Sequence, residues 1–374
     1  MKALTLDVGL LGPSGPANLV SPNRANTGYC DGTTFTPLTD NWFDGRTGEF
    51  HGNTRSKDGL NPRWAATFYG KNAERDKNGS RGLPIALMGA HGELRWQRVV
   101  TGVSMYFDRN ETGASMGLFH QAVEIYGAGL HAFAYDRLLA GKFIREVMLA
   151  GVMPLVEMKG ASPHDPHVAV PEGLQYKLGN KSQPKPLAIA RALETITHPV
   201  GGGRCAHQIW ALDGMLRSCP PDEHRPNFDS DILQRSDLRF HEDANGSRSL
   251  VGHYEVPCRH GDVKFRFDHS GQRMGSSHEC ALADWVRPIH IPLEAPHLRG
   301  FRVDVESVFR TAKGAETLFG RASSLEPDFF LLDIVGFALW QNAIAWDVHA
   351  SQHTVCGQHC AAAVARKANR SAQS

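Results

Sequence analysis

The sequence lacks an excess of charge of either sign. Its 374 residues include 40 lysines and arginines against 39 aspartates and glutamates, which gives a formal net charge of +1. This balance excludes a strongly basic surface of the kind that attracts nucleic acid over long distances. Any contact with DNA would have to come from local basic patches or from the 19 histidines.

Cysteines and long apolar runs near the N-terminus are also scarce. Seven cysteines, an odd number spread over the chain, favour the reduced thiols of a cytoplasmic protein over a disulfide framework. The first apolar run is too short for a signal peptide or a membrane span, since Asp7 and several prolines interrupt it. A later apolar helix contains Asp333 and Asp347 and favours burial against a sheet, with a membrane span as the minor alternative. We expect a cytoplasmic protein without a membrane partner.

The first 160 residues predict an α/β fold. Residues 3–11 suggest an edge strand, and strand-like runs at 29–38, 63–70, 82–90 and 94–107 suggest an antiparallel set. From Glu111 to Tyr126 the apolar residues recur at helical spacing. A strand ending in Asp136, a helix over 139–151 and a buried strand over 152–158 then follow.

Residues 161–290 differ in composition and are interpreted as an insertion. The run PKPLAIARALETI, residues 184–196, predicts a helix, and HYEVPCRHGDVKFRFDHS, residues 253–270, predicts a hairpin. The triple glycine at 201–203 lacks the lysine of a phosphate loop and predicts a turn. The expected divisions are 1–160, the first part of the main domain; 161–290, the insertion; 291–350, the last part of the main domain; and 351–374, a flexible tail.

Two groups of cysteines and histidines invite a metal-binding interpretation. One group lies in the insertion and the other in the C-terminal run SQHTVCGQHC, residues 351–360. The spacings do not match a zinc finger, so scattered structural residues are the favoured interpretation of both groups. The insertion group comprises Cys219, Cys258, His260, His278 and Cys280.

The stretch LRGFRVDVESVFRTAK, residues 298–313, predicts an amphipathic helix. Phe301, Val305, Val308 and Ala312 form an apolar stripe at helical spacing. A second stripe beside it carries Arg302, Glu306 and Lys313, with Arg310 at its margin. Exposed pairing of Glu306 with the arginines would be worth only about 0.3–0.5 kcal/mol. The alternative is that the glutamate serves a site.

Three carboxylates are candidates for such a site: Asp31 and Asp136 on predicted strands and Glu306 on the late helix. Singly, each aspartate is more typical of a turn or a helix cap. Together, three carboxylates from separate elements match what phosphoryl transfer with two divalent ions requires. Mg²⁺ suits such a site because it binds few protein oxygens and keeps positions open for water and phosphate.

The residues quoted above resemble the DDE transposases of bacterial insertion sequences. That family carries the signature Y-x2-R-x3-E-x6-K, and Arg302, Glu306 and Lys313 match three of its four positions. Arg299 stands at the tyrosine position. CDGTTF, with Asp31, resembles the family's first acidic strand, and FAYDRLLAGKFIREVM, with Asp136, resembles the second.

The resemblance implies a fold and a site. The fold would be α/β: a ribonuclease H-like mixed sheet flanked by helices, with a partly β insertion before the catalytic glutamate. Asp31, Asp136 and Glu306 would be catalytic and would bind Mg²⁺ or Mn²⁺. DNA contacts would come from Arg302, Lys313, Arg310 and Arg299. The partner would be double-stranded DNA, both transposon ends and target, bound by a homodimer.

Two alternatives stay open. Only 30 residues precede Asp31, where relatives usually carry a DNA-binding region, so one alternative is a truncated, inactive DNA-binding remnant. The other is a ribonuclease H-like nuclease that acts on other nucleic acid.

Overall fold

The computed structural model describes residues 2–35, 83–158, 190–219, 232–271, 281–314 and 327–371, apart from 15–16, 95, 107–109, 137–138 and 213, together with three short strands between residues 42 and 66. The side chains of the three short strands and of residues 190, 299, 302, 327 and 352–371 lie outside this description. The chain forms two compact units. Unit 1 comprises residues 1–17, 23–130 and 300–374, and unit 2 comprises residues 18–22 and 131–299.

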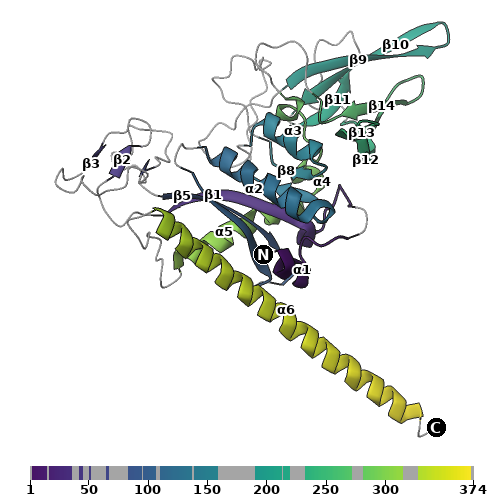
Figure 1. Ribbon diagram of the computed structural model, residues 1–374. Helices are drawn as coiled ribbons and strands as arrows, with labels where there is room; N and C mark the ends of the chain where they lie inside the picture. The colour runs from purple at the N-terminus through teal and green to yellow at the C-terminus, as the bar shows by residue number, and fades with distance from the viewer. Residues whose placement is uncertain are drawn as a thin grey trace, which may run out of the picture. The chain divides into compact units, whose positions relative to one another are not determined.

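The chain contains both helices and strands (Figure 1), and its strands pair in both antiparallel and parallel fashion. The expected α/β class is therefore confirmed. The predicted division into main domain, insertion and tail stays a prediction.

Unit 1 contains an antiparallel set of three long strands. β1 (Thr27–Phe35) pairs with β5 (Leu83–His91), which pairs with β6 (Arg98–Met105). Every residue of β5 is buried, as expected for a central strand. Three short strands, β2 (Trp42–Asp44), β3 (Phe50–His51) and β4 (Ala65–Ala66), form a separate small sheet. The predicted strands at 29–38 and 82–90 are thus confirmed over their described residues, and the strand predicted at 94–107 is confirmed over Arg98–Met105.

Helix α2 (Glu111–Tyr126) confirms the helix predicted from Glu111 and packs against β1, β5 and β6. Its N-terminus is capped by Asn110, whose side chain accepts a hydrogen bond from the Gly113 amide. The short 3₁₀ turns η1 (Arg24–Asn26) and η3 (Gly127–Gly129) flank β1 and α2.

The edge strand predicted for residues 3–11 is wrong. Residues 2–7 form helix α1 (Lys2–Asp7), and Gly9, with φ +76°, turns the chain behind it. The apolar run is buried without forming a strand, because this turn places Leu10 and Leu11 in the core, where both are fully buried. Thr5, also buried, hydrogen-bonds to the Tyr126 hydroxyl at 3.1 Å.

The two late helices are α5 (Arg299–Gly314) and α6 (Pro327–Ser371). α6 packs on β6, where the buried Asn342 side chain bonds both the amide and the carbonyl of Val100 at 2.7 and 2.9 Å. Within α6, Asp328–Ser351 is long and apolar enough to cross a membrane by length and composition, with 39% of its most apolar window buried. A core helix passes the same test, so this single helix is weak evidence for a membrane span. The cytoplasmic location stays a prediction.

Unit 2 begins with a strand, a helix and a strand, as predicted. β7 (Ala132–Ala134) pairs in parallel with β8 (Met153–Leu155), and α3 (Gly141–Leu149) connects them. A crossover helix is the usual way to join neighbouring parallel strands.

The rest of unit 2 is built mainly of two antiparallel three-stranded sheets (Figure 1). One has the order β11-β10-β9, from β9 (Ala190–Val200), β10 (Gly203–Leu212) and β11 (Met215–Cys219). The other has the order β12-β13-β14, from β12 (Gln234–Glu242), β13 (Arg248–Val256) and β14 (Val263–Asp268). The chain then continues through η4 (Leu282–Asp284), α4 (Ile291–Glu294) and η5 (Pro296–Leu298).

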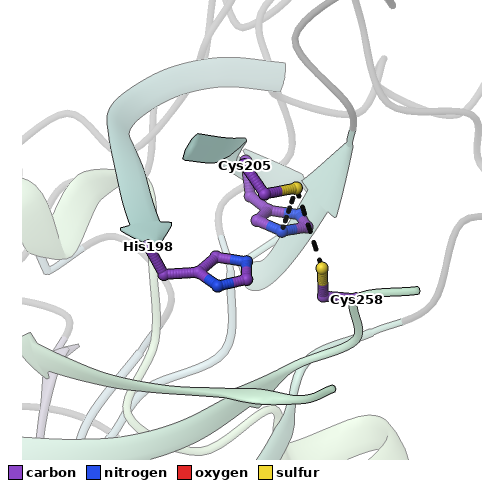
Figure 2. Close-up of side chains that lie close together, drawn as sticks. His198, Cys205 and Cys258 are labelled. Carbon is purple, nitrogen blue, oxygen red and sulfur yellow. Dashed lines mark hydrogen bonds between the residues drawn. The ribbon is translucent and has the colours of Figure 1, made fainter. Parts of the chain in front are cut away.

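The hairpin and the turn predicted in the insertion are confirmed, as β13–β14 and as the turn between β9 and β10. The helix predicted over 184–196 is wrong for its described part, because residues 190–196 belong to β9. Pairing with β10 along the whole strand overrides the local helix preference. The β9–β10 hairpin also brings His198 and Cys205 close to Cys258, which lies two residues after the end of β13 (Figure 2).

Candidate functional site

The candidate site lies on the first strand of unit 1. Because side chains alternate along a strand, Tyr29, Asp31, Thr33 and Phe35 share one face of β1. Two residues of that face, Thr33 and Phe35, contact Lys313 of α5. Asp31 lies half-buried between them and Tyr29, and its Oδ1 accepts a hydrogen bond from the Gly32 amide at 2.8 Å.

Helix α5 lies beside this face, and it is amphipathic as predicted. Its apolar stripe is buried: Val305 and Val308 are fully enclosed and Phe301 is only 9% exposed. The adjacent stripe carries Glu306 and Arg310, both exposed, and Lys313, half-buried. The register of the helix therefore places the acid and the two bases together beside the strand.

A pocket of about 490 Å³ opens between β1 and α5. It is lined by two carboxylates, two cationic side chains and their neighbours: Asp31, Gly32, Thr33, Glu306, Phe309, Arg310, Lys313 and Gly314. The structure thus brings together two of the three predicted acids and two of the four predicted basic residues. Such a pocket is able to bind a divalent cation through its carboxylate oxygens and phosphate oxygens through its cations.

Lys313 is held in place by specific contacts. Its ammonium donates a hydrogen bond to the Thr33 hydroxyl at 2.7 Å and lies 5.7 Å from the centre of the Phe35 ring. Partial burial lowers the pKa of this ammonium from its usual value. A base fixed in this way at a pocket wall is already positioned for an anion, so little side-chain freedom would be lost on binding.

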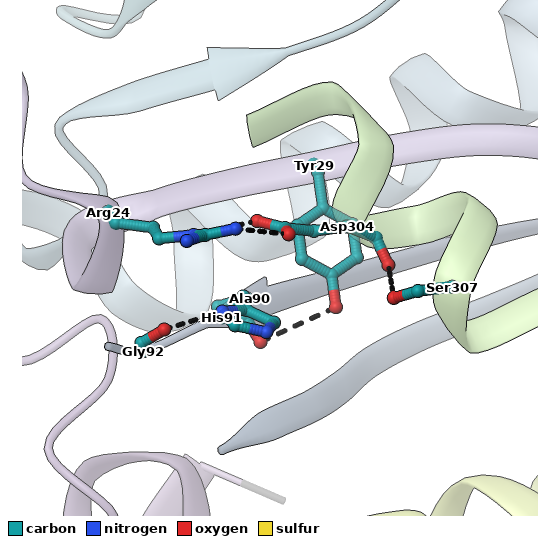
Figure 3. A network of polar contacts seen from close by, with 7 residues as sticks. All are labelled: Arg24, Tyr29, Ala90, His91, Gly92, Asp304 and Ser307. Atoms are coloured by element: carbon teal, nitrogen blue, oxygen red, sulfur yellow. Dashed lines mark hydrogen bonds and ion pairs between the residues drawn. The ribbon is translucent and has the colours of Figure 1, made fainter. Parts of the chain in front are cut away.

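The position of α5 is fixed by an ion pair that sequence reasoning missed. Arg24, in η1, donates from Nε to Asp304 Oδ2 at 3.0 Å and from Nη2 to Oδ1 (Figure 3). The Asp304 side chain is only 8% exposed, against 29% for Arg24. The guanidinium also lies 5.6 Å from the centre of the Phe301 ring. This two-pronged contact ties the N-terminal half of α5 to the start of β1.

Polar groups under this ion pair are kept neutral. Burial, and next the nearby Asp304 carboxylate, raise the pKa of the Tyr29 hydroxyl, which donates to the Ala90 carbonyl at 3.5 Å (Figure 3). Burial also lowers the pKa of His91, whose Nδ1 donates to the Gly92 carbonyl. Tyr29 and His91 are therefore uncharged beside the Arg24–Asp304 pair.

A carboxylate of helix α2, which the sequence analysis did not select, lies against β1 at Gly32. Glu111, at the start of α2, lies so close to Gly32 that a Cβ there would sit 2.3 Å from its carboxyl carbon. Tyr106 donates a hydrogen bond to the same carboxylate at 3.1 Å. Glu111 is not part of the pocket lining, and a side chain at residue 32 would require the Glu111 side chain to shift.

The remaining predicted site residues fall elsewhere. Asp136 follows β7, is half-buried and belongs to unit 2, so its convergence with Asp31 and Glu306 stays a prediction. Arg299 and Arg302 lie on α5, but their side chains are outside the described residues. Their contacts with DNA also stay predictions.

Comparison of the chain with known protein families, with curated proteins and with solved structures found no match. The resemblance to DDE transposases therefore depends on the residues quoted for it and on the pocket between β1 and α5.

Proposed function

We propose that the protein is a DNA transposase of the DDE type, with a ribonuclease H-like catalytic domain, and that the pocket between β1 and α5 is part of its catalytic centre. The observation that carries the proposal is the shared pocket of Asp31 and Glu306, residues 275 positions apart in the chain, beside Arg310 and Lys313. If the two acids were ordinary surface residues, nothing would require the strand and the helix that hold them to meet at one pocket.

The donor set fits magnesium. Asp31 and Glu306 offer only carboxylate oxygens, which are the ligands that this hard cation prefers. In this proposal Asp136 completes the set. The ion would supply an activated water and stabilise the departing 3′ oxygen.

The chain's own residues would orient the DNA. Lys313, held by Thr33, and Arg310, at the pocket rim, would bind phosphate oxygens next to the scissile bond and neutralise their charge. Arg302 and Arg299, on the same helix, would extend this contact along the backbone of the DNA. The freed 3′ hydroxyl would remain at the pocket for attack on a target strand.

The test is nicking of a supercoiled plasmid that carries the coding region with its flanking DNA, in Mg²⁺ and in EDTA. We expect Mg²⁺-dependent nicks at the flanks. The cleavage rate should fall at least about 100-fold in Asp31→Asn, Asp136→Asn and Glu306→Gln, because loss of a group that only hydrogen-bonds to a metal ligand already costs about 10–100-fold. Asp333→Asn, an exposed acid on α6, is the matched control and should cleave normally.

Other outcomes reject the proposal in distinct ways. Salt-sensitive DNA binding with no cleavage in any metal would identify an inactive remnant. Mg²⁺-dependent cleavage without preference for the flanks would identify a nuclease. Full activity of any one variant would remove that residue from the site.

A further inference from the structure

Four metal-binding side chains meet in unit 2, and none of them lines the proposed catalytic pocket. They are His198, Cys205, His207 and Cys258. One ligand atom from each lies within 4.8 Å of the ligand atoms of the other three. Both cysteines are free thiols and all four side chains are buried or half-buried.

Strand register explains why three of them gather on one hairpin. The turn at 201–202, with φ +97° at Gly202, sets β9 and β10 in a register that places His198 directly opposite Cys205. His207 is two residues beyond Cys205, so its side chain lies on the same face of β10. The rings of His198 and His207 stack with centroids 5.5 Å apart.

The fourth residue, Cys258, comes from the connection between β13 and β14. This connection turns tightly at Gly261, whose φ is +108° and whose amide donates to the Cys258 carbonyl at 3.0 Å. The His260 amide also donates to the Cys258 sulfur at 3.4 Å. An amide aimed at a sulfur stabilises the thiolate form, which is the form that binds metal.

The distances match a tetrahedral ion. The two sulfurs are 3.7 Å apart, and Cys205 Sγ lies 3.5 Å from His207 Nε2. A tetrahedral zinc with Zn–S of about 2.3 Å and Zn–N of about 2.0–2.1 Å separates two sulfurs by about 3.8 Å and a sulfur from a nitrogen by about 3.6 Å. A disulfide needs about 2.05 Å between its sulfurs, far less than the 3.7 Å observed.

The environment of His198 is also consistent with a missing partner. Its Nε2 is buried and has no hydrogen-bond partner within the part of the chain that the structure describes. A buried ring nitrogen left without a partner is costly, whereas coordination to a cation would satisfy it.

We propose that His198, Cys205, His207 and Cys258 form a structural zinc site of the Cys₂His₂ type. Four protein ligands close the coordination sphere and leave no position for a substrate, so the ion has a structural role. Two thiolates and two imidazoles also select zinc over magnesium, which separates this site chemically from the carboxylate pocket.

The position of the site in unit 2 explains what the ion does. The core of the two sheets includes Ile209 and Phe265, and also Val256, the last residue of β13. The turn end of the β9–β10 hairpin is exposed, with an exposed to half-buried pattern over Gly203–Ala206. Zinc would tie this end of the hairpin to the β13–β14 connection.

The test measures zinc in the purified full-length chain by elemental analysis, followed by replacement with Co²⁺ and absorption spectroscopy. We expect about one zinc per chain, and a tetrahedral cobalt spectrum with thiolate charge-transfer bands. Cys205→Ser and Cys258→Ser should each lose the zinc. His260→Ala, a neighbour whose side chain is not in the set, and the double variant Cys356→Ser/Cys360→Ser should keep it.

Cys258→His guards against a variant that merely fails to fold. It should retain a tetrahedral cobalt spectrum with roughly half of the charge-transfer intensity, because one of two thiolates is gone. Absence of zinc and of a cobalt spectrum in the folded chain would overturn the proposal. Full zinc content in the double variant Cys205→Ser/Cys258→Ser, or a Cys205–Cys258 disulfide found by mass spectrometry, would do the same. None of these results depends on DNA cleavage.

Discussion

The Arg24–Asp304 ion pair gives an asymmetric prediction about the anchoring of α5. In Arg24→Met, the Asp304 carboxylate, only 8% exposed, loses its partner and stays buried. Breaking a fully buried pair in this way costs about 3–5 kcal/mol, and the partial exposure of Arg24 favours the lower end, about 3 kcal/mol. In Asp304→Asn, the Arg24 guanidinium, 29% exposed, is able to reach water and keeps an amide acceptor, so the expected cost is about 1–2 kcal/mol.

The assay is urea-dependent hydrogen exchange of peptides from β1 and α5 in the full-length chain, which reports the local free energy of opening. The double variant Arg24→Met/Asp304→Asn should cost about 1–3 kcal/mol less than the sum of the two single changes, since the residues are in direct contact. Additive costs, or a larger loss in Asp304→Asn than in Arg24→Met, would refute the idea that a nearly buried carboxylate is held by a more exposed arginine.

Three further predictions concern single side chains. Burial lowers the pKa of His269 to about 3, and an unfolded histidine has a pKa near 6.5, so the stability it contributes is present above pH 6.5 and is lost as the pH falls toward 3. Urea unfolding should show the wild type losing about 1.4 kcal/mol more than His269→Gln between pH 7.5 and 5.5, and equal losses would contradict the shift. Asn342→Leu should lower the free energy of unfolding, measured by thermal unfolding, by about 2–4 kcal/mol, because it leaves the amide and carbonyl of Val100 without their side-chain partner. A change within about 0.5 kcal/mol, which is typical of surface positions, would mean that water replaces the side chain. Lys313→Ala should weaken binding of short duplex DNA and reduce the salt dependence of log K by about one unit, while Lys313→Arg keeps both; identical salt slopes would exclude a phosphate contact.

The parts of the fold that depend on local pattern could be predicted from the sequence. The stripe of Phe301, Val305 and Val308 follows from helical spacing, and burial of that stripe determines where Glu306 and Lys313 face. The strands β5 and β6 follow from strand-like runs, and the helix α2 follows from apolar residues at helical spacing. These predictions need no knowledge of a distant segment.

The failures are features that depend on distant partners. Asp304 looks like one more surface acid of α5 until Arg24, 280 residues earlier, is placed beside it. Residues 190–196 have helix-forming composition, and only pairing with β10 makes them a strand. The same holds for Cys258: the sequence groups it with Cys219, His260, His278 and Cys280, whereas the β9–β10 register brings His198, Cys205 and His207 beside it. His278 and Cys280 lie outside the described residues.

The most direct test of the proposed metal site is the affinity for Mn²⁺, measured by electron paramagnetic resonance in the full-length chain and in three variants. Asp31 and Glu306 are proposed to share a divalent ion in one pocket. Asp31→Asn and Glu306→Gln should therefore each weaken binding at least about 10-fold, while Asp333→Asn binds as the wild type does. Unchanged Mn²⁺ affinity in both pocket variants would contradict the account.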